Sequence, residues 1–355
     1  MSMRTLLKLG KSSLVVVLPK DWLNEMGLKN GDKVLVKQED DGSLKIIPAN
    51  ISIGRTINNA RLAINVDKCK DKGLVSRLLI ANYLIGNDSV VIRTRRGGVS
   101  AEILKEIREI ITKLRGFEII EQKPNRILLQ CVTDATSFSI DNLIGRMLSL
   151  LLSMIDYLRR GLSERKQDYF QEAIFIEEEI DRIYWFGVRQ LIMVQRNRAL
   201  AKLVGLESTL HIVGNRAILK ALELAGDYIE EMAKDLSKLS LDKISALPNI
   251  PEKICELINR IEDIISDAVR TYNGIDIFLA NNVLERINEI TKITHSLSEE
   301  IMNKCRDVKT GVILVKLLTR LSDMAKSIGT VCEIVLNRAM ENPSRSLQNC
   351  IYREF

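Results

Sequence analysis

The pattern of hydrophobic and polar positions changes along the chain and divides it into three stretches. In residues 3–48 apolar and polar residues alternate with a period of two, which predicts short β-strands. A short helix is expected between Pro19, which suits a first helical turn, and Gly27, which suits a helix C-cap. Three or four short strands are expected within TLLKLGKSSLVVVL (5–18), KVLVKQ (33–38) and SLKII (43–47). Pro48 ends this first unit, because proline cannot extend a central strand.

The second stretch, residues 51 to about 135, predicts a small sheet with helices on one side. Ser100 suits the N-cap of a helix whose apolar stripe runs from Ile103 to Leu114. The other expected elements are a helix in KGLVSRLLIANYLIG (72–86) and strands in SVVIRTR (89–95), GFEIIEQ (116–122) and NRILLQCV (125–132). The segment therefore reads as α/β.

From Asp141 onward the helical period of 3.6 dominates and proline and glycine become scarce. Helices are expected at about 141–162, 164–197, 207–238, 251–272, 275–304 and 308–340. Two groups of three helices of similar length, separated by the linker ALPNIPEK, indicate an internal duplication. We therefore predict an α+β multidomain protein. Its expected domains are 1–50, 51–135, and two three-helix repeats at 136–240 and 250–340.

The composition favours a cytoplasmic location and argues against a membrane-spanning segment. The chain has 355 residues and a formal net charge of +6, so contact with nucleic acid is expected to be local. Its six cysteines form no CxxC pair, which favours a reducing, cytoplasmic location without disulfides. The most apolar stretch, residues 143–158, is interrupted by Arg146 and Asp156. It is too short between charges to cross a bilayer, so no membrane insertion is expected.

The first unit is too small to bury a self-sufficient core, so it is expected to need a second copy. GKSSLVVVLPKDWLNEMGLKNGDKVLVKQEDDGSLKIIP resembles the swapped-hairpin, AbrB-type DNA-binding domain, and this resemblance implies a homodimer with interleaved strands. The only charges in the first twenty residues are Arg4, Lys8, Lys11 and Lys20. These four are the candidate DNA-binding residues, through phosphate contacts. The alternative is that they only solvate the outer face of the strands.

Two pairs of acids, each spaced four apart, are candidate metal ligands in the first helical repeat. Glu177 and Asp181 share a helix face with apolar neighbours, so burial would require a cation or a donor nearby. Glu223 and Asp227 lie in a charged row from Arg216 to Lys234, a pattern that by itself favours a solvated face over a ligand site. The spacing alone leaves both interpretations open.

The sequences EEEIDRIYW and ALELAGDYIEEMA resemble successive helices of the PhoU family, in which such acids bind metal. The resemblance implies Glu177, Asp181, Glu223 and Asp227 as oxygen ligands of magnesium, manganese, iron or zinc. A weaker second site would use Glu285, Glu289 and Asp323, because Thr319 stands where a further acid is expected. An AbrB-like front joined to a PhoU-like back resembles archaeal phosphate-uptake regulators.

An enzyme is the main rival class. His211 and His295, the two histidines, fit structural or solvated positions better than catalytic ones, and no nucleophile elbow, GxxxxGK loop or HExxH helix occurs. RTRRGGVS (93–100) could cradle an anion or form a strand end and turn. We predict no enzyme but a homodimeric transcriptional regulator of phosphate uptake with DNA as partner. The alternative is an adaptor that docks on a phosphate transporter without binding DNA.

Overall fold

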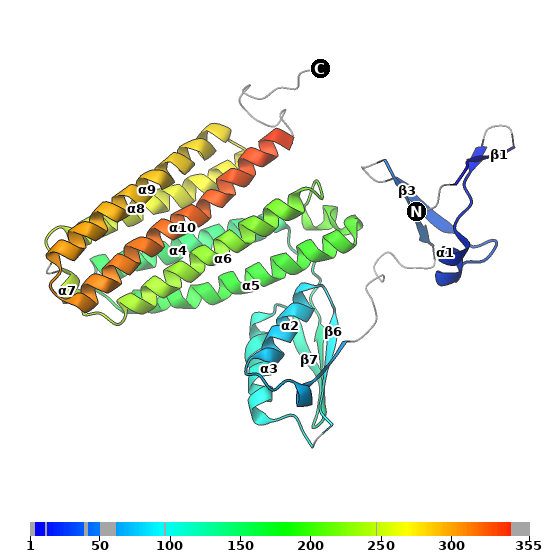
Figure 1. Cartoon of the computed structure of the whole chain (residues 1–355), viewed down its shortest axis with the longest axis horizontal. Helices are drawn as coiled ribbons and strands as arrows, with labels where there is room; N and C mark the ends of the chain where they lie inside the picture. The colour runs from blue at the N-terminus through cyan, green and yellow to red at the C-terminus, as the bar shows by residue number, and fades with distance from the viewer. Residues whose placement is uncertain are drawn as a thin grey trace. The chain divides into compact units, whose positions relative to one another are not determined.

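The computed structural model describes residues 4–10, 13–38, 42–49, 62–95, 97–245 and 247–341. The chain divides into two compact units, Met1–Arg61 and Leu62–Phe355. The second unit contains both the α/β segment and the long helices (Figure 1).

The first unit consists of two antiparallel hairpins and one short helix. β1 (Leu7–Leu9) pairs with β2 (Ser13–Val15), and β3 (Val34–Gln38) pairs with β4 (Leu44–Pro48). Between the hairpins lies α1 (Lys20–Glu25), which follows Pro19 and ends before Gly27 at a positive φ of 64°. A left-handed turn there favours glycine, which explains where the helix stops. The expected strand, short helix and hairpin are confirmed.

These hairpins leave much of their apolar surface in water. Val36 on β3 is 59% exposed and Leu14 on β2 is 64% exposed. Neither of the two hydrophobic cores in the described part of the chain contains a residue of this unit. Two isolated two-stranded ribbons are marginal in water, so the unit as folded here lacks a core of its own.

The α/β segment is a four-stranded sheet with two helices on one face (Figure 1). The strand order is β5-β6-β8-β7, with β5 parallel to β6 and the other pairs antiparallel. Its elements are β5 (Leu62–Asn65), α2 (Leu74–Leu84), β6 (Ser89–Arg93), α3 (Ala101–Lys113), β7 (Phe117–Lys123) and β8 (Arg126–Cys131). All except β5 match the expected elements closely. The edge strand β5 was not predicted, because four residues carry too little pattern.

Helix α3 begins and packs as its sequence indicates. The Ser100 hydroxyl accepts a hydrogen bond from the Ile103 backbone N–H at 3.4 Å and caps the helix. Ile107 and Leu114 are buried against the sheet, so the predicted apolar stripe is the inner face of α3. The last residue of α3 is Lys113.

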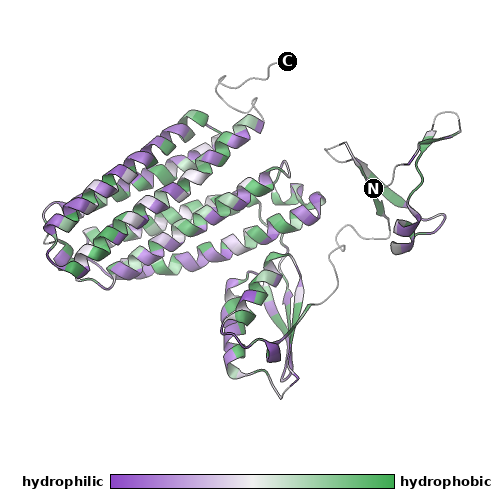
Figure 2. Ribbon diagram, viewed as in Figure 1, coloured by the Kyte–Doolittle hydropathy of each residue, from purple (hydrophilic) through white to green (hydrophobic). Residues whose placement is uncertain are grey.

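Six long helices make up most of the remaining described part of the second unit, as expected. They are α4 (Ile140–Ser163), α5 (Asp168–Arg196), α6 (His211–Leu236), α8 (Ile250–Gly274), α9 (Ile277–Lys304) and α10 (Val308–Glu341). The short α7 (Leu241–Ser245) lies in the connection between the two groups of three. Figure 2 shows hydrophobic and hydrophilic residues alternating along each long helix, which is the pattern of a helix buried on one side.

One continuous core joins the six helices. It contains apolar side chains from every long helix, and α6 packs along α10 while α4 packs along α8. The α+β class with a helical C-terminal part is therefore confirmed. Among the residues that the structure describes, no helix combines the length and the apolar character required to cross a bilayer.

Candidate functional site

Helices α5 and α6 of the bundle approach each other closely at two glycines. A Cβ on Gly226 of α6 would lie 3.2 Å from Cδ1 of Ile180, and one on Gly187 of α5 would lie 2.8 Å from Cδ1 of Leu219. These contacts show that α5 and α6 run antiparallel, and they place Ile180 next to Gly226. The adjoining residues Asp181 and Asp227 are therefore brought together across the helix pair.

Three of the four predicted ligands form a compact group of carboxylates. Oxygen atoms of Glu177, Asp181 and Asp227 all lie within 4.8 Å of one another, and within the described residues no other group of three acids, histidines or cysteines has this arrangement. Glu177 is 6% exposed, and the other two are partly buried. We call these three residues the acidic triad.

The acidic triad holds its negative charge at an energetic cost. Burial, followed by repulsion from Asp181, raises the pKa of Glu177 to about 8. Burial and the nearby Glu223 raise the pKa of Asp227 to about 6. The pKa of Asp181 is also raised by burial, although Lys113 and a hydrogen bond with Glu177 oppose the rise. The positive charge near the triad is therefore too small to keep all three carboxylates ionised at their ordinary pKa values.

The fourth predicted ligand, Glu223, is engaged elsewhere. Its carboxylate accepts a hydrogen bond from the Lys220 ammonium one turn earlier on α6. Burial raises the pKa of Glu223, and Lys220 opposes the rise. The structure therefore brings together Glu177, Asp181 and Asp227 but places Glu223 in an ion pair beside them.

Sequence reasoning missed Lys113, which comes from a different part of the fold. Its Nζ lies 3.8 Å from Oδ2 of Asp181. Lys113 ends α3 of the α/β segment, 68 positions before Asp181 in the chain. No spacing within the sequence connects a helix C-terminus with an acid so far away, so no local signal could have identified this contact.

The acidic triad fits a hard cation. Closely spaced carboxylate oxygens are the ligands that magnesium, manganese and iron accept, and a cation would offset the burial and the repulsion that raise the pKa of Glu177. Zinc fits less well, because the triad contains neither histidine nor cysteine. Glu177, Asp181 and Asp227 are the residues that would hold the ion.

The corresponding acids of the second repeat do not gather in this way. Glu285 and Glu289 are exposed on α9. Asp323 on α10 pairs with Lys326 at 3.3 Å. Thr319, the predicted departure from the pattern, donates its hydroxyl to the carbonyl of Val315. The geometry gives the weaker second metal site no support.

Of the four predicted DNA-binding residues, three lie in the described part of the chain. Arg4, Lys8 on β1 and Lys20 at the start of α1 are all exposed, whereas Lys11 lies outside the described residues. Lys8 stands opposite Leu14 in the first hairpin, so the two side chains share one face of the ribbon. These cations are available to a polyanion.

The histidines and the arginine-rich loop have local partners. His211 Nε2 lies 3.1 Å from Oε2 of Glu341, and His295 Nδ1 lies 3.7 Å from Oε1 of Glu299. In RTRRGGVS the Thr94 hydroxyl and the Arg95 backbone N–H both donate to Asp67. An acid organising this loop favours the strand end and turn over an anion cradle.

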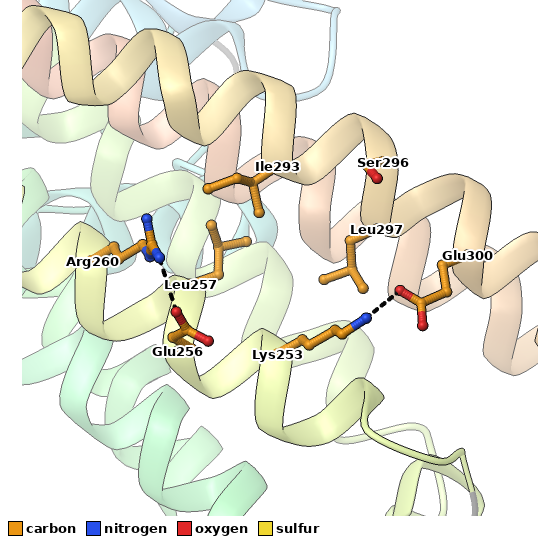
Figure 3. Close-up of a pocket in the computed structure, with 8 residues that line it drawn as sticks. All are labelled: Lys253, Glu256, Leu257, Arg260, Ile293, Ser296, Leu297 and Glu300. Atoms are coloured by element: carbon orange, nitrogen blue, oxygen red, sulfur yellow. Dashed lines mark hydrogen bonds and ion pairs between the residues drawn. The ribbon is translucent and has the colours of Figure 1, made fainter.

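A groove of about 280 Å³ lies between α8 and α9 (Figure 3). Leu257, Ile293 and Leu297 form its floor, and Lys253 reaches across to Glu300 with an Nζ to Oε2 distance of 2.6 Å. The charged groups at its rim pair with one another, so the groove presents no convergent set of unpaired polar groups of the kind that defines a small-molecule site.

Comparisons with known family models match two parts of the chain, the N-terminal unit and the first three-helix repeat. Residues 7–53 match the family model described as antidote-toxin recognition MazE, bacterial antitoxin, and residues 144–236 match the PhoU domain. No curated protein matches the chain. These matches confirm both resemblances: an AbrB-like or MazE-like domain at the front and a PhoU domain in the helical part.

Two solved structures are similar to the helical part. The phosphate transport system regulatory protein PhoU from Streptococcus pneumoniae is 15% identical, with a TM-score of 0.49, and the match covers 57% of this chain and 94% of that one. PhoU from Pseudomonas aeruginosa is 16% identical, with a TM-score of 0.48, and covers 56% and 93% respectively.

Proposed function

We propose that this chain, which joins a MazE/AbrB-like domain to a PhoU domain, is a DNA-binding transcriptional regulator of phosphate uptake. The observation that carries the proposal is the presence of both domains in one polypeptide. A PhoU domain suggests regulation of phosphate transport, and a MazE/AbrB-like domain is consistent with binding DNA. A transcriptional regulator would use both domains of one chain, the first to bind DNA and the second to respond to phosphate transport.

The first unit supplies features that a DNA-binding dimer needs. Its hairpins expose apolar side chains that a second copy would cover, and Arg4, Lys8 and Lys20 are exposed for phosphate contact. Lys11, the remaining predicted contact, belongs to the same proposal. We infer a homodimer in which the first units of two chains interleave.

DNA binding is tested by fluorescence anisotropy with DNA from upstream of the protein's own gene and with a scrambled duplex of the same length. We expect preference for the upstream DNA and, for about eight phosphate contacts per dimer, an affinity that falls about ten-thousandfold between roughly 50 and 200 mM salt. Lys8→Ala should lower the slope of log affinity against log salt by about two, one for each chain of the dimer.

The matched control is Lys105→Ala, which removes an exposed lysine of the second unit and should leave both affinity and slope unchanged. Equal binding of the two duplexes, together with an unaltered slope for Lys8→Ala, would contradict a DNA-binding role. A dimer that binds no DNA would instead favour the adaptor that docks on a phosphate transporter.

We propose in addition that the acidic triad holds a divalent or trivalent cation. When bound, the cation supplies the positive charge that three closely spaced carboxylates lack. Glu177 and Asp181 would hold the ion from α5 and Asp227 from α6, so the ion would join the two helices. Freeing Glu223 from Lys220 would add a fourth oxygen ligand.

Metal content per chain, measured by elemental analysis after purification and dialysis, tests this part. The double variant Glu177→Gln with Asp227→Asn should lose most of the metal that the parent carries. Glu178→Gln is the matched control, because Glu178 is an exposed acid on the same helix that pairs with Arg182. Equal metal content in the double variant and the parent would remove the proposed site.

A further inference from the structure

The α/β segment reaches the proposed metal site with a positive charge. The Lys113 ammonium, at the last residue of α3, lies 3.8 Å from the Asp181 carboxylate, and both side chains retain limited access to water. Asp181 is a member of the acidic triad. One carboxylate is therefore shared between a candidate metal site in the bundle and a lysine of another segment.

The segment that carries Lys113 is packed along the same helix. Trp185, one turn after Asp181 on α5, packs against both the bundle core and the core of the α/β segment. Arg189, one further turn along, donates to the backbone carbonyls of Tyr83 at 2.7 Å and Asn87 at 2.9 Å. α5 thus carries two members of the acidic triad, Glu177 and Asp181, and contacts the α/β segment over the next two turns.

A lysine and a metal ion cannot both be close to Asp181 without cost. Like charges at contact distance in a partly buried site repel strongly, because the effective dielectric constant there is well below that of water. The second nearby lysine, Lys220, is already paired with Glu223 on its own helix. Lys113 is the charge near the triad whose position depends on the α/β segment.

We propose that Lys113 is a tethered cation that competes with the metal for Asp181, so that metal binding releases the end of α3 from α5. This inference rests on the proposed metal site and assigns its regulation to the α/β segment. Because binding and conformation are linked reciprocally, any release of Lys113 by metal requires that Lys113 weakens metal binding to the same extent.

The experiment uses full-length protein freed of metal with a chelator and titrated with Mn²⁺ by isothermal calorimetry. Lys113→Met keeps the apolar stem and removes the charge, and we expect it to bind Mn²⁺ about tenfold more tightly than the parent. Lys113→Arg, which keeps the charge, should bind like the parent. Lys105→Met is the control, since Lys105 lies on the same helix and pairs with Glu109.

A second measurement does not depend on a variant. Acetic anhydride labelling followed by mass spectrometry should show that Lys113 becomes more reactive when Mn²⁺ is added, while Lys105 does not change. Lower or equal Mn²⁺ affinity in Lys113→Met, with binding by the parent, would overturn the competition and leave the metal site intact. Absence of Mn²⁺ binding in both proteins would overturn the metal site and this inference together. Binding by Lys113→Met alone would support the inference in its strongest form.

Discussion

At the scale of single residues, Glu177 is a buried carboxylic acid surrounded by other acids, which makes its ionised form costly in free energy. It is 6% exposed, and this burial raises its pKa; repulsion from Asp181, Glu230 and Asp227 raises the pKa further. A buried carboxylate without a paired cation is costly, so this group keeps its proton when no metal is present. The protonated group can donate a hydrogen bond to Asp181, and a cation would replace that proton.

Glu177 therefore makes the metal-free protein less stable at high pH. Its pKa is about 8 in the folded chain and 4.5 in a model peptide, so between these values the folded state holds more protons than the unfolded state. Stability should fall as the pH rises from about 4.5 to about 8 and then level off. In a chelator at pH 9, Glu177→Gln should raise the free energy of unfolding by on the order of 2 kcal/mol.

Urea denaturation at pH 5 and pH 9 checks this prediction, with Glu178→Gln as the exposed control on the same helix. At pH 5 the parent and Glu177→Gln should differ little. Adding Mn²⁺ at pH 9 should reverse the order, because only a site that binds metal gains stability from it. A parent protein that is more stable than Glu177→Gln at pH 9 in chelator would contradict the assigned burial of charge.

At the scale of elements, the two hairpins of the first unit pair well along their strands but leave apolar faces uncovered. Val34, Val36, Ile46 and Leu44 share one face of the second hairpin through the pairs Val34↔Pro48, Val36↔Ile46 and Gln38↔Leu44. Val36 is 59% exposed on that face. Burial of such a face stabilises a fold in proportion to its area, and a second chain can supply the cover.

Val36→Glu should therefore weaken dimerisation. A carboxylate placed in an interface is desolvated without a partner, which should shift the chain toward monomer by at least tenfold in dissociation constant, or about 1.4 kcal/mol. Light scattering coupled to size-exclusion chromatography, over a range of protein concentrations, measures the shift. Lys45→Glu, on the opposite face of the same hairpin, is the control. Equal mass for Val36→Glu and the parent would show that this face is not an interface.

At the scale of the whole second unit, a buried arginine fastens the α/β segment to the bundle. Arg189 is 1% exposed, donates to two backbone carbonyls and to Asp88 Oδ1 at 2.7 Å, and lies over the Tyr83 ring. Gly86 in the same loop comes so close to α5 that a Cβ would lie 2.8 Å from Cγ of Met193. These hydrogen bonds and close contacts form the junction that holds the α/β segment against α5.

Arg189→Met should uncouple the two parts. It removes the side-chain donor of the Asn87 carbonyl and of Asp88, and one of the two donors of the Tyr83 carbonyl, at a cost on the order of 3 kcal/mol. We expect the α/β segment to unfold before the bundle, seen as a second transition in urea or as faster proteolysis of residues 62–135. Arg196→Met, which removes an exposed arginine of α5, should retain a single transition. A single, unshifted transition in Arg189→Met would contradict the junction.

Most of the elements follow from the local sequence. Each of the six long helices begins and ends within a few residues of its predicted limits, because a period of 3.6 sustained over many residues, with caps such as Ser139 and Asp276, is a local property. The same holds for the pairing of Glu177 with Asp181, which lie one turn apart on a single helix. Strand β5 was not predicted, because the formation of a short edge strand depends more on the neighbouring strand than on its own sequence pattern.

By itself, then, the sequence determined the class of fold, the elements and which acids could act together on each helix. Only the tertiary structure decided which of those acids meet. It placed Asp227 with Glu177 and Asp181, gave Glu223 to Lys220, and set Lys113 beside Asp181. The physical reason is that the periodicity of the sequence indicates only on which side of its helix a residue lies. Contacts between helices depend on the angle at which the helices cross and on how their side chains pack.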